Sequence, residues 1–382
     1  MKRHLFIVDP IAFNGGSKVA TENILRLLNG DRNRITVLSA DSDSWQWPGL
    51  QRLRLYQPRW LSRREQGLLY FLRHALIALQ ILWVRLRCGR VDTVLGASGP
   101  GVDLALYLLK PVLKFQLLQL VHGPVARSRT IARCLLYADE VHYLASAADS
   151  LNTTLTTLQP GMDISTLPTF HLMRNGLSSH AWPQPCQTER PVVFWAASLL
   201  KWKGLETLLT ALLRFDQTTR PQTEICYIRP KDIALPISQA PIKIAGVHWH
   251  KQPDDLDRLR ASANIFVSTS HSEPFGLSIL EAMAAGHCIL IPADGAYWDS
   301  QLENGVHCIK YRPGDDADLA AKLACLCRNF ALVLSLGAAA RKVAQHYRAD
   351  RQYRAIKHAL EHGVNKQPPH PRPPQARSET VL

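Results

Sequence analysis

The sequence predicts an α/β protein with two doubly wound domains in tandem, and three observations lead to this prediction. Short apolar runs bounded by turn residues alternate with helical patterns along most of the chain. A polar, proline-containing stretch divides this series near its middle. Hydrophobic residues make up 46% and charged residues 20% of the 382 residues, which is typical of soluble globular proteins and leaves ample material for two cores.

The first half of the chain opens with a predicted strand from His4 to Val8. This run follows a basic start but is cut by Asp9 and Pro10, so it is too short for the core of a signal peptide. We therefore interpret it as the first strand of a cytoplasmic protein. Further apolar runs, separated by helical segments, predict the strands 35–39, 93–97, 115–121, 140–144 and 171–174.

The second half of the chain repeats this alternation. Parallel strands need crossover connections, and helical patterns of suitable length lie between the apolar runs. The predicted strands are 192–197, 225–228, 242–247, 265–268 and 288–291. The predicted helices lie near 204–215, 253–261, 275–285 and 317–327.

The segment from Leu177 to Arg190 is polar, contains proline and lacks periodicity, so it predicts an interdomain linker with a boundary near Trp182. The domains expected from this boundary are 1–182 and 183–345, followed by a C-terminal helix over 346–362. Residues 363–382 are rich in proline and almost free of apolar residues, so they bury too little surface to offset chain entropy. We expect this tail to be disordered.

Positive charge is concentrated in the first domain. The formal net charge is +14, and nine arginines lie between residues 51 and 90 against one acid, Glu65. Such a patch suits nucleic acid, an anionic membrane or an anionic substrate, and net charge does not choose among them. Nucleic-acid binding calls for aromatic side chains interleaved along a basic groove, whereas most aromatic residues here lie in one apolar segment. No nucleic-acid partner is therefore expected.

That apolar segment, Leu68 to Val84, is interrupted only by Arg73, His74 and Gln80. It is short for a membrane span and carries a charge inside. Two interpretations remain open: a buried helix of the first domain, or an interfacial helix whose flanking arginines attract anionic lipid. Peripheral contact with the inner membrane face through residues 52–90 is thus an expectation alongside the buried-helix interpretation.

Neither the cysteines nor the acidic residues show a metal-binding pattern. The eight cysteines are scattered without a C-x2-C pair, which favours reduced and mostly buried thiols. Asp41-Ser42-Asp43 has a D-x-D pattern, but it lies just after the second strand, so we interpret it as a polar loop. The sequence predicts no metal and no other cofactor.

The segment from Ser268 to Pro292 carries the clearest functional pattern. It combines a strand end, a Glu-Pro turn, a helix and a buried strand, and ligands of open α/β sheets bind at this edge. The helix start offers free N–H groups and a positive dipole end for a phosphate. Glu273 precedes the helix and Glu281 lies about 12 Å further along it. This spacing suits a sugar at one carboxylate and a ribose at the other, with a diphosphate between them.

The E-x7-E pattern in HSEPFGLSILEAMAAG resembles the donor-site motif of glycosyltransferase family four, whose members retain anomeric configuration and use nucleotide sugars. The resemblance implies the GT-B fold, with two Rossmann-like domains and a cleft between them. Other segments match the family in the same order along the chain. They are FNGGSKVATENILRLL, LVHG, YADEVHYLAS, MRNG and KWKGLETLLTAL.

The resemblance implies a role for each matched residue. Glu273 would contact the hydroxyls of the donor sugar, and Glu281 would hold the nucleotide ribose. Lys203 would neutralise the diphosphate in place of a metal, and His122 would lie at the reacting face of the first domain. The other donor-site residues that it implies are Gly15, Gly16, Ser198, Phe275, Gly276 and Leu277.

One position departs from the family pattern. The family usually has Gly-Arg ahead of the phosphate-binding lysine, whereas this chain has Ala197-Ser198. Half of the usual cationic clamp is therefore missing. Lys18, Lys201 and Arg229 are the candidates to replace it.

The function expected from this resemblance is transfer of a sugar from a nucleotide-diphosphate sugar to a glycan or lipid-linked acceptor, in bacterial cell-surface polysaccharide or lipopolysaccharide synthesis. The leaving diphosphate would accept the acceptor's proton, so no protein nucleophile is assigned. Alternatives are a nucleotide-sugar epimerase or a phosphorylase on the same fold. A scaffold or a nucleic-acid- or membrane-binding protein without catalysis is a further alternative.

Overall fold

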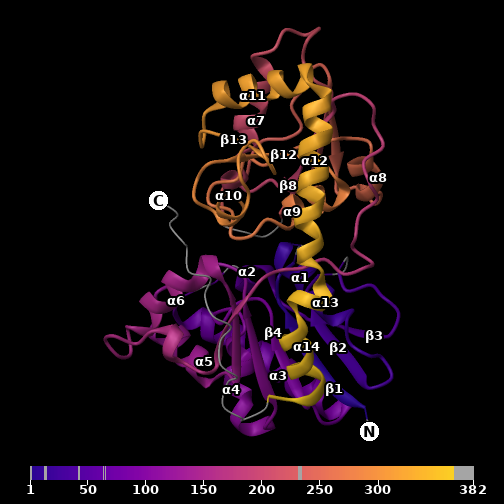
Figure 1. The fold of residues 1–382 in the computed structure, drawn as a ribbon. Coiled ribbons are helices and arrows are strands. Elements are labelled where there is room, and N and C mark those ends of the chain that lie inside the picture. Colours follow the sequence, from indigo (N-terminus) through magenta and orange to yellow (C-terminus); the bar gives the residue numbers. More distant parts are fainter. Residues whose placement is uncertain are drawn as a thin grey trace, which may run out of the picture.

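The computed structural model contains two parallel β-sheets, one above the other in Figure 1. It describes residues 2–12, 15–41, 44–62, 64, 66–230 and 235–364. Within these residues the first sheet has seven strands and the second has six. The predicted fold class, an α/β protein with two doubly wound domains, is confirmed. Ser42 and Asp43 of the predicted polar loop and residues 365–382 of the predicted tail lie outside the described residues.

The first sheet has the strand order β3-β2-β1-β4-β5-β6-β7, with every pair parallel. Its order reverses between β1 and β4, which places the topological switch point at the carboxyl ends of these two strands. The strands are β1 (Arg3–Asp9), β2 (Asn33–Ser39), β3 (Leu50–Arg54), β4 (Thr93–Gly96), β5 (Gln116–Val121), β6 (Glu140–Leu144) and β7 (Phe170–Met173). Strand β3 was not predicted, because this exposed edge strand alternates leucine with charged and polar residues.

Helices cover both faces of this sheet. Apolar side chains from β1, β4 and β5 pack beneath them, so the sheet is buried as a parallel sheet must be. The helices are α1 (Gly16–Leu25), α2 (Arg59–Ser62), α3 (Gly67–Cys88), α4 (Leu104–Leu113), α5 (Arg129–Tyr137) and α6 (Ala148–Leu155).

The second sheet has the order β10-β9-β8-β11-β12-β13, again with parallel pairs. Its strands are β8 (Val193–Ser198), β9 (Thr223–Ile228), β10 (Val247–Lys251), β11 (Ile265–Val267), β12 (Cys288–Pro292) and β13 (Ile309–Tyr311). Its helices are α7 (Leu205–Leu213), α8 (Leu256–Ala261), α9 (Leu277–Ala285), α10 (Tyr297–Gln301), α11 (Asp316–Arg328) and α12 (Phe330–Ala344).

Two edge strands of the second sheet correct the sequence prediction. The strand predicted at 242–247 lies instead at β10, because Ile244 accepts a turn hydrogen bond from Val247 N and Gly246 has φ +78. Strand β10 has the partly exposed sequence VHWHK, which gives little apolar periodicity. Strand β13 is a short edge strand that was not predicted.

The C-terminal segment returns from the second domain to the first. Figure 1 shows α12 running along the second domain toward α13 (Ala349–Gln352) and α14 (Arg354–His362), which lie beside the first sheet. The single helix expected over 346–362 is thus interrupted, with a break at Tyr353. The Tyr353 hydroxyl accepts from Gly176 N at 3.0 Å and donates to Asn175 Oδ1 at 3.2 Å. These bonds tie the returning helices to the end of the first domain.

One hydrophobic cluster joins the two domains. It runs from Ile7 in β1 through Met173, Tyr347 and Tyr353 to Phe275, beside the start of α9. Each sheet also has a cluster of its own. The shared cluster therefore supports the same edge of both sheets, where the predicted site residues lie.

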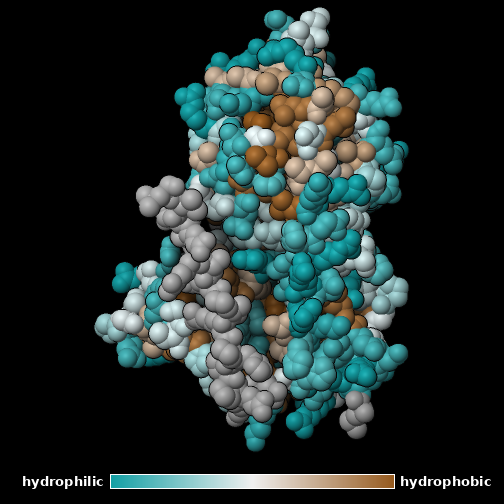
Figure 2. All heavy atoms as spheres, viewed as in Figure 1, coloured by the Kyte–Doolittle hydropathy of each residue, from teal (hydrophilic) through white to brown (hydrophobic). Residues whose placement is uncertain are grey.

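The surface is hydrophilic over most of the face shown in Figure 2, with hydrophobic residues gathered beside α12 in the second domain. Among the described residues, α3 is long and apolar enough to cross a membrane by length and composition alone. Helices α11 and α12 together would also be long and apolar enough, but their axes are bent by 103° relative to each other. Only 28% of the most apolar stretch of α3 is buried in the protein, so α3 is not a fully buried core helix.

Candidate active site

The N-terminus of α9 is held in place by a glycine and an aromatic anchor. Gly276 has φ +75, and a Cβ there would lie 2.9 Å from Ile279 Cδ1 and 3.0 Å from Glu273 Cγ. Glycine is therefore required for the turn that starts the helix. Phe275 is buried, and its ring lies 4.8 Å from that of Tyr297 and 5.2 Å from that of Trp298. This packing presents the free N–H groups of the first turn, beginning at Leu277, at the carboxyl edge of the sheet.

Lys203 lies directly against Glu273 at this edge. Its ammonium is 2.5 Å from Glu273 Oε2, and both side chains are mostly buried. The Lys203 carbonyl accepts from Thr269 Oγ1 at 2.8 Å, and Thr269 accepts from Trp195 Nε1 at 3.0 Å. A Cβ on the adjacent Gly204, which has φ +67, would lie 2.1 Å from Thr269 O, so this close approach also requires glycine. The structure thus brings together a cation, a carboxylate and a helix N-terminus.

Glu281 lies in the second turn of α9 and forms an ion pair with Arg260. The Arg260 Nη2 to Glu281 Oε2 distance is 2.6 Å, and Arg260 Nη1 also contacts Asp257 at 3.0 Å. Burial raises the pKa of Glu281, while the Arg260 guanidinium acts in the opposite direction. The side chain of Glu281 is 19% exposed, so a ligand can reach it. Sequence reasoning missed Arg260, because nothing local to α8 indicates a partner on α9.

A small cavity borders Glu273. Its volume is about 10 Å³, which is roughly the space that one water molecule needs. Asp294, a second residue that sequence reasoning missed, accepts from Ser272 N at 2.9 Å and so fixes the loop ahead of Glu273. Among the residues that line the cavity are Ser268, Ser270, Glu273, Asp294 and Asp299.

His122 follows β5 in the first domain and approaches this site from the other side. Neither ring nitrogen has a hydrogen-bond partner among the described residues, and burial lowers the pKa of the imidazole to about 4. The ring is therefore neutral at neutral pH. A Cβ built on the adjacent Gly123 would lie 4.0 Å from Pro274 Cγ. The loop carrying His122 thus meets the loop carrying Glu273 across the two domains.

Gly15 and Gly16 lie at the start of α1, at the carboxyl end of β1. A Cβ on Gly16 would meet nothing within 4 Å, so this position is open. Lys18 is buried and contacts Asp9 at 2.9 Å and Asp41 at 3.1 Å. Lys18 is therefore fixed inside the first domain, and Asp41 is its partner.

The chain offers no direct substitute for the missing arginine among the three candidates. Ser198 lies at the end of β8, opposite Ile228 of β9. Lys18 is paired as described, Lys201 contacts Glu206 at 2.6 Å, and Arg229 donates to Ala240 O at 2.7 Å. Lys203 is consequently the predicted cation that the structure places beside Glu273.

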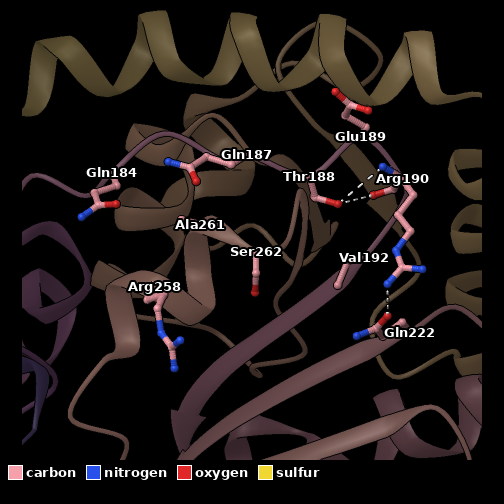
Figure 3. Close-up of a pocket in the computed structure, with 10 residues that line it drawn as sticks. All are labelled: Gln184, Gln187, Thr188, Glu189, Arg190, Val192, Gln222, Arg258, Ala261 and Ser262. Atoms are coloured by element: carbon pink, nitrogen blue, oxygen red, sulfur yellow. Dashed lines mark hydrogen bonds between the residues drawn. The ribbon is translucent and has the colours of Figure 1, made fainter.

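A larger pocket lies elsewhere in the second domain. It has a volume of about 710 Å³ and lies at the amino ends of the second-sheet strands, opposite the edge that carries Glu273. Figure 3 shows the linker crossing it, with the Arg190 side chain reaching Gln222. None of the predicted donor-site residues lines it, so its size does not mark the candidate active site. Its polar lining includes Gln184, Gln187, Thr188, Arg190, Gln222 and Ser262.

The described part of the chain contains no group of three or more His, Cys, Asp or Glu side chains arranged to hold a metal ion. Four of the eight free cysteines are buried, three are partly buried and Cys325 is exposed. Cys325 is thus an exception to the expected burial.

Comparison with known proteins finds a family match for the second domain. Residues 180–343 match the protein family described as Glycosyl transferases group 1. The sulfoquinovosyl transferase SQD2 of Arabidopsis thaliana is 27% identical over 167 residues, which cover 42% of this chain and 31% of that protein. The alpha-maltose-1-phosphate synthase of Mycolicibacterium smegmatis is 26% identical over 210 residues, covering 49% and 52%. The chain therefore spans about half or less of these curated relatives.

Solved structures match the whole chain. HepE of Anabaena, crystallised with UDP and glucose, is 16% identical with a TM-score of 0.67, covering 95% of this chain and all of that one. The sucrose-phosphate synthase of Thermosynechococcus elongatus is 17% identical with a TM-score of 0.66, covering 93% and 96%. WaaG, a glycosyltransferase involved in lipopolysaccharide biosynthesis, is 13% identical with a TM-score of 0.62, covering 94% and 100%.

These findings define the fold. The chain has the GT-B fold, since the structural matches cover more than nine-tenths of it. The similarity to glycosyl transferases group 1 lies in the second domain.

Proposed function

We propose that this protein transfers a sugar from a nucleotide-diphosphate sugar to a glycan or lipid-linked acceptor, with retention of configuration. One observation carries the proposal: the Lys203–Glu273 pair lies at the N-terminus of α9, where the loop carrying His122 meets it from the first domain. The glycosyltransferase group 1 match and the UDP bound to the similar HepE structure support a nucleotide-sugar donor.

The charges at this edge suit the diphosphate of such a donor. Free N–H groups at the start of α9 and the Lys203 ammonium both favour an anion, and Gly276 permits close approach of the backbone. Charge grows on the diphosphate as the sugar leaves, so a fixed cation stabilises the transition state more than the ground state. Lys203 supplies this charge in the proposed reaction, and no metal is required.

The carboxylates and the histidine position the rest of the donor. Glu273 accepts hydrogen bonds from the sugar hydroxyls, and Glu281 accepts them from the ribose. Both nitrogens of the neutral His122 ring lack a partner among the residues that the structure describes, so the ring can both donate to and accept from the transferred sugar and the acceptor. No protein nucleophile is proposed, and the leaving diphosphate takes the acceptor's proton.

The acceptor and its pathway extend the same proposal. The similarity to WaaG, which takes part in lipopolysaccharide biosynthesis, supports a role in bacterial cell-surface polysaccharide or lipopolysaccharide synthesis. Such acceptors are assembled at the inner face of a membrane, so the proposal includes a cytoplasmic protein that contacts this face through residues 52–90.

One observation favours a second candidate, a GT-B scaffold without catalysis. Ser198 stands where the family pattern has arginine, and Lys18, Lys201 and Arg229 are engaged elsewhere. A scaffold that has lost its donor site does not bind a nucleotide, and an epimerase turns over its nucleotide sugar without an acceptor. Nucleotide binding and the need for an acceptor therefore separate the three functions.

The test is calorimetric titration of the protein with UDP, GDP and ADP, first without metal and then with magnesium. We expect one nucleotide to bind without metal and Glu281→Ala to weaken it. Glu224→Ala is the matched control, because Glu224 is also a largely buried carboxylate with a nitrogen partner, His250 Nε2 at 2.7 Å, but lies near the amino end of β9. Absence of binding by all three nucleotides contradicts the proposal, as does an equal loss in both variants.

A further inference from the structure

The outward face of α3 is apolar along the whole helix. Its inward side buries Ile77, Ile81 and Val84 against the first domain. At 100° per residue, Leu68, Leu72, Leu79, Trp83 and Leu86 fall within an arc of about 60° on the opposite side. All of these five side chains are exposed, and Leu68 and Leu86 at the two ends are 84% and 85% exposed. The usual pattern for a surface helix is polar on this side.

The polar side chains of α3 do not interrupt this face. Arg73 and His74 are buried on the inward side. Gln80 is tied to the segment ahead of α2, since it accepts from Tyr56 N at 2.8 Å and its amide donates to Tyr56 O at 2.9 Å. The outward arc from Leu68 to Leu86 therefore carries no charged residue.

Neighbouring helices also carry exposed apolar side chains. Helix α3 packs against α2 and α4, and each contributes exposed apolar side chains of its own. These side chains include Trp60 on α2 and Leu108 and Val112 on α4. An apolar area of this extent on a protein surface marks an interaction site.

The charges around this surface identify the partner. Arg85, Arg87 and Arg90 follow the apolar face at its C-terminal end, and no acidic residue lies between residues 66 and 90. The Arg87 guanidinium lies 5.2 Å from the ring centroid of Trp83, at the boundary between apolar and basic residues. A second copy of the chain would bring the same arginines together, whereas an anionic lipid surface complements them.

We infer that the outward face of α3, with Trp60, Leu108 and Val112, is a docking surface that lies flat in the headgroup region of an anionic phospholipid bilayer. The apolar side chains enter the acyl boundary while the arginines contact lipid phosphates. The inference rests on the proposed function for its purpose, because a lipid-linked acceptor would be met at the same surface. The docking surface itself uses none of the donor-site residues.

The test is co-sedimentation of the full chain with vesicles of phosphatidylcholine, with and without phosphatidylglycerol. We expect strong binding to the anionic vesicles and weak binding to the neutral ones. Leu79→Glu combined with Leu86→Glu should lower partitioning more than about tenfold, since each removes one inserted leucine. Leu334→Glu is the matched control, because Leu334 is an exposed leucine on α12 of the second domain.

A second variant keeps the test independent of changes in the apolar face. Arg85→Gln combined with Arg87→Gln leaves every leucine in place and should weaken binding to anionic vesicles about fivefold for each arginine. Binding to neutral vesicles should stay unchanged. Equal binding of this variant and the wild type to anionic vesicles overturns the inference.

Three other results overturn it: wild-type protein that stays in the supernatant with anionic vesicles, an equal loss in the Leu334→Glu control, or a wild-type dimer that the α3 variant converts to monomers without vesicles. Nucleotide titration of the same preparations separates the two proposals. Vesicle binding without nucleotide binding leaves the docking surface and contradicts the proposed sugar transfer. Nucleotide binding without vesicle binding overturns the docking surface, together with the membrane contact through residues 52–90, and leaves the proposed sugar transfer.

Discussion

At the residue scale, Lys203 and Glu273 depend on each other. Their ion pair is mostly buried, so removal of either partner leaves the other charge poorly compensated. A diphosphate bound at the start of α9 would compete with Glu273 for the ammonium, and sugar hydroxyls would compete with Lys203 for the carboxylate. The pair thus holds both side chains in place.

We expect Lys203→Ala to lower glycosyl transfer about a hundredfold to a thousandfold, because it removes the fixed positive charge next to the leaving diphosphate. The measurement is the steady-state rate of transfer from a nucleotide sugar that carries the nucleotide identified by the calorimetric titration. Lys201→Ala is the matched control, since Lys201 is two residues away and pairs with the exposed Glu206. An equal loss in the control would show that Lys201, and not Lys203 alone, faces the diphosphate.

Glu281 and Arg260 make a comparable pair within the second domain. Arg260 is also held by Asp257, so its guanidinium has a second fixed partner. The raised pKa of Glu281 reflects its burial, and the guanidinium opposes that rise. Arg260 is therefore a positioning residue for the carboxylate.

At the scale of elements, the start of α9 depends on the backbone of Gly276. Its φ of +75 lies in the left-handed region, and neighbouring side chains leave no room for a Cβ. The same turn fixes Glu273 ahead of the helix and Leu277 as its first residue. Phe275 anchors the turn in the shared hydrophobic cluster.

We expect Gly276→Ala to lower the free energy of unfolding by about 1–3 kcal/mol and to abolish nucleotide binding, because the strained turn must shift the helix start. Urea unfolding and calorimetric titration measure the two effects. Gly305→Ala is the control: its φ is +79, but a Cβ there would meet nothing within 4 Å and it lies away from α9. If Gly305→Ala also lost nucleotide binding, the loss in Gly276→Ala would not come from the geometry of α9.

At the scale of the whole molecule, buried ionisable groups set the pH dependence of stability. Burial lowers the pKa of His74 and His122 to about 4 and that of His287 to about 3. The unfolded chain therefore binds more protons than the native state between pH 4 and 6.5, and these histidines reduce stability as the pH falls through this window. Burial raises the pKa of Asp103 to about 7. The native state therefore takes up a proton at Asp103 as the pH falls through 7, and this group increases stability where the histidines reduce it.

Two variants separate these opposing contributions. His74→Leu removes a ring whose nitrogens are both buried without a partner among the described residues, so we expect it to fold and to lose less stability than the wild type from pH 7 to 5. Asp103→Asn should lose more, because it no longer takes up a proton on folding. The difference should be on the order of 1 kcal/mol or more at pH 5 in urea unfolding. Parallel curves for all three proteins would contradict the assignment.

Part of this molecule follows from local sequence alone. Alternating apolar runs and helical patterns predicted the two parallel-sheet domains, because a buried parallel strand and its crossover helix each have their own periodicity. The turn, glycine and carboxylates from Glu273 to Glu281 predicted a helix start with acids on either side. Edge strands β3, β10 and β13 were missed or misplaced, since each has only two apolar residues, separated by polar or charged ones, and so lacks the apolar run that marks a buried strand.

The partners of the site residues were decided by tertiary structure. Lys203 and Glu273 are 70 residues apart in sequence, and Arg260 and Glu281 are 21 apart, so no local pattern records their pairing. The same holds for Gly123 and Pro274, which meet across the domains, and for Lys18, which Asp9 and Asp41 hold inside the first domain. Periodicity reports which face of an element is buried, whereas pairing between elements depends on how the crossovers and the returning α13 and α14 place them in space.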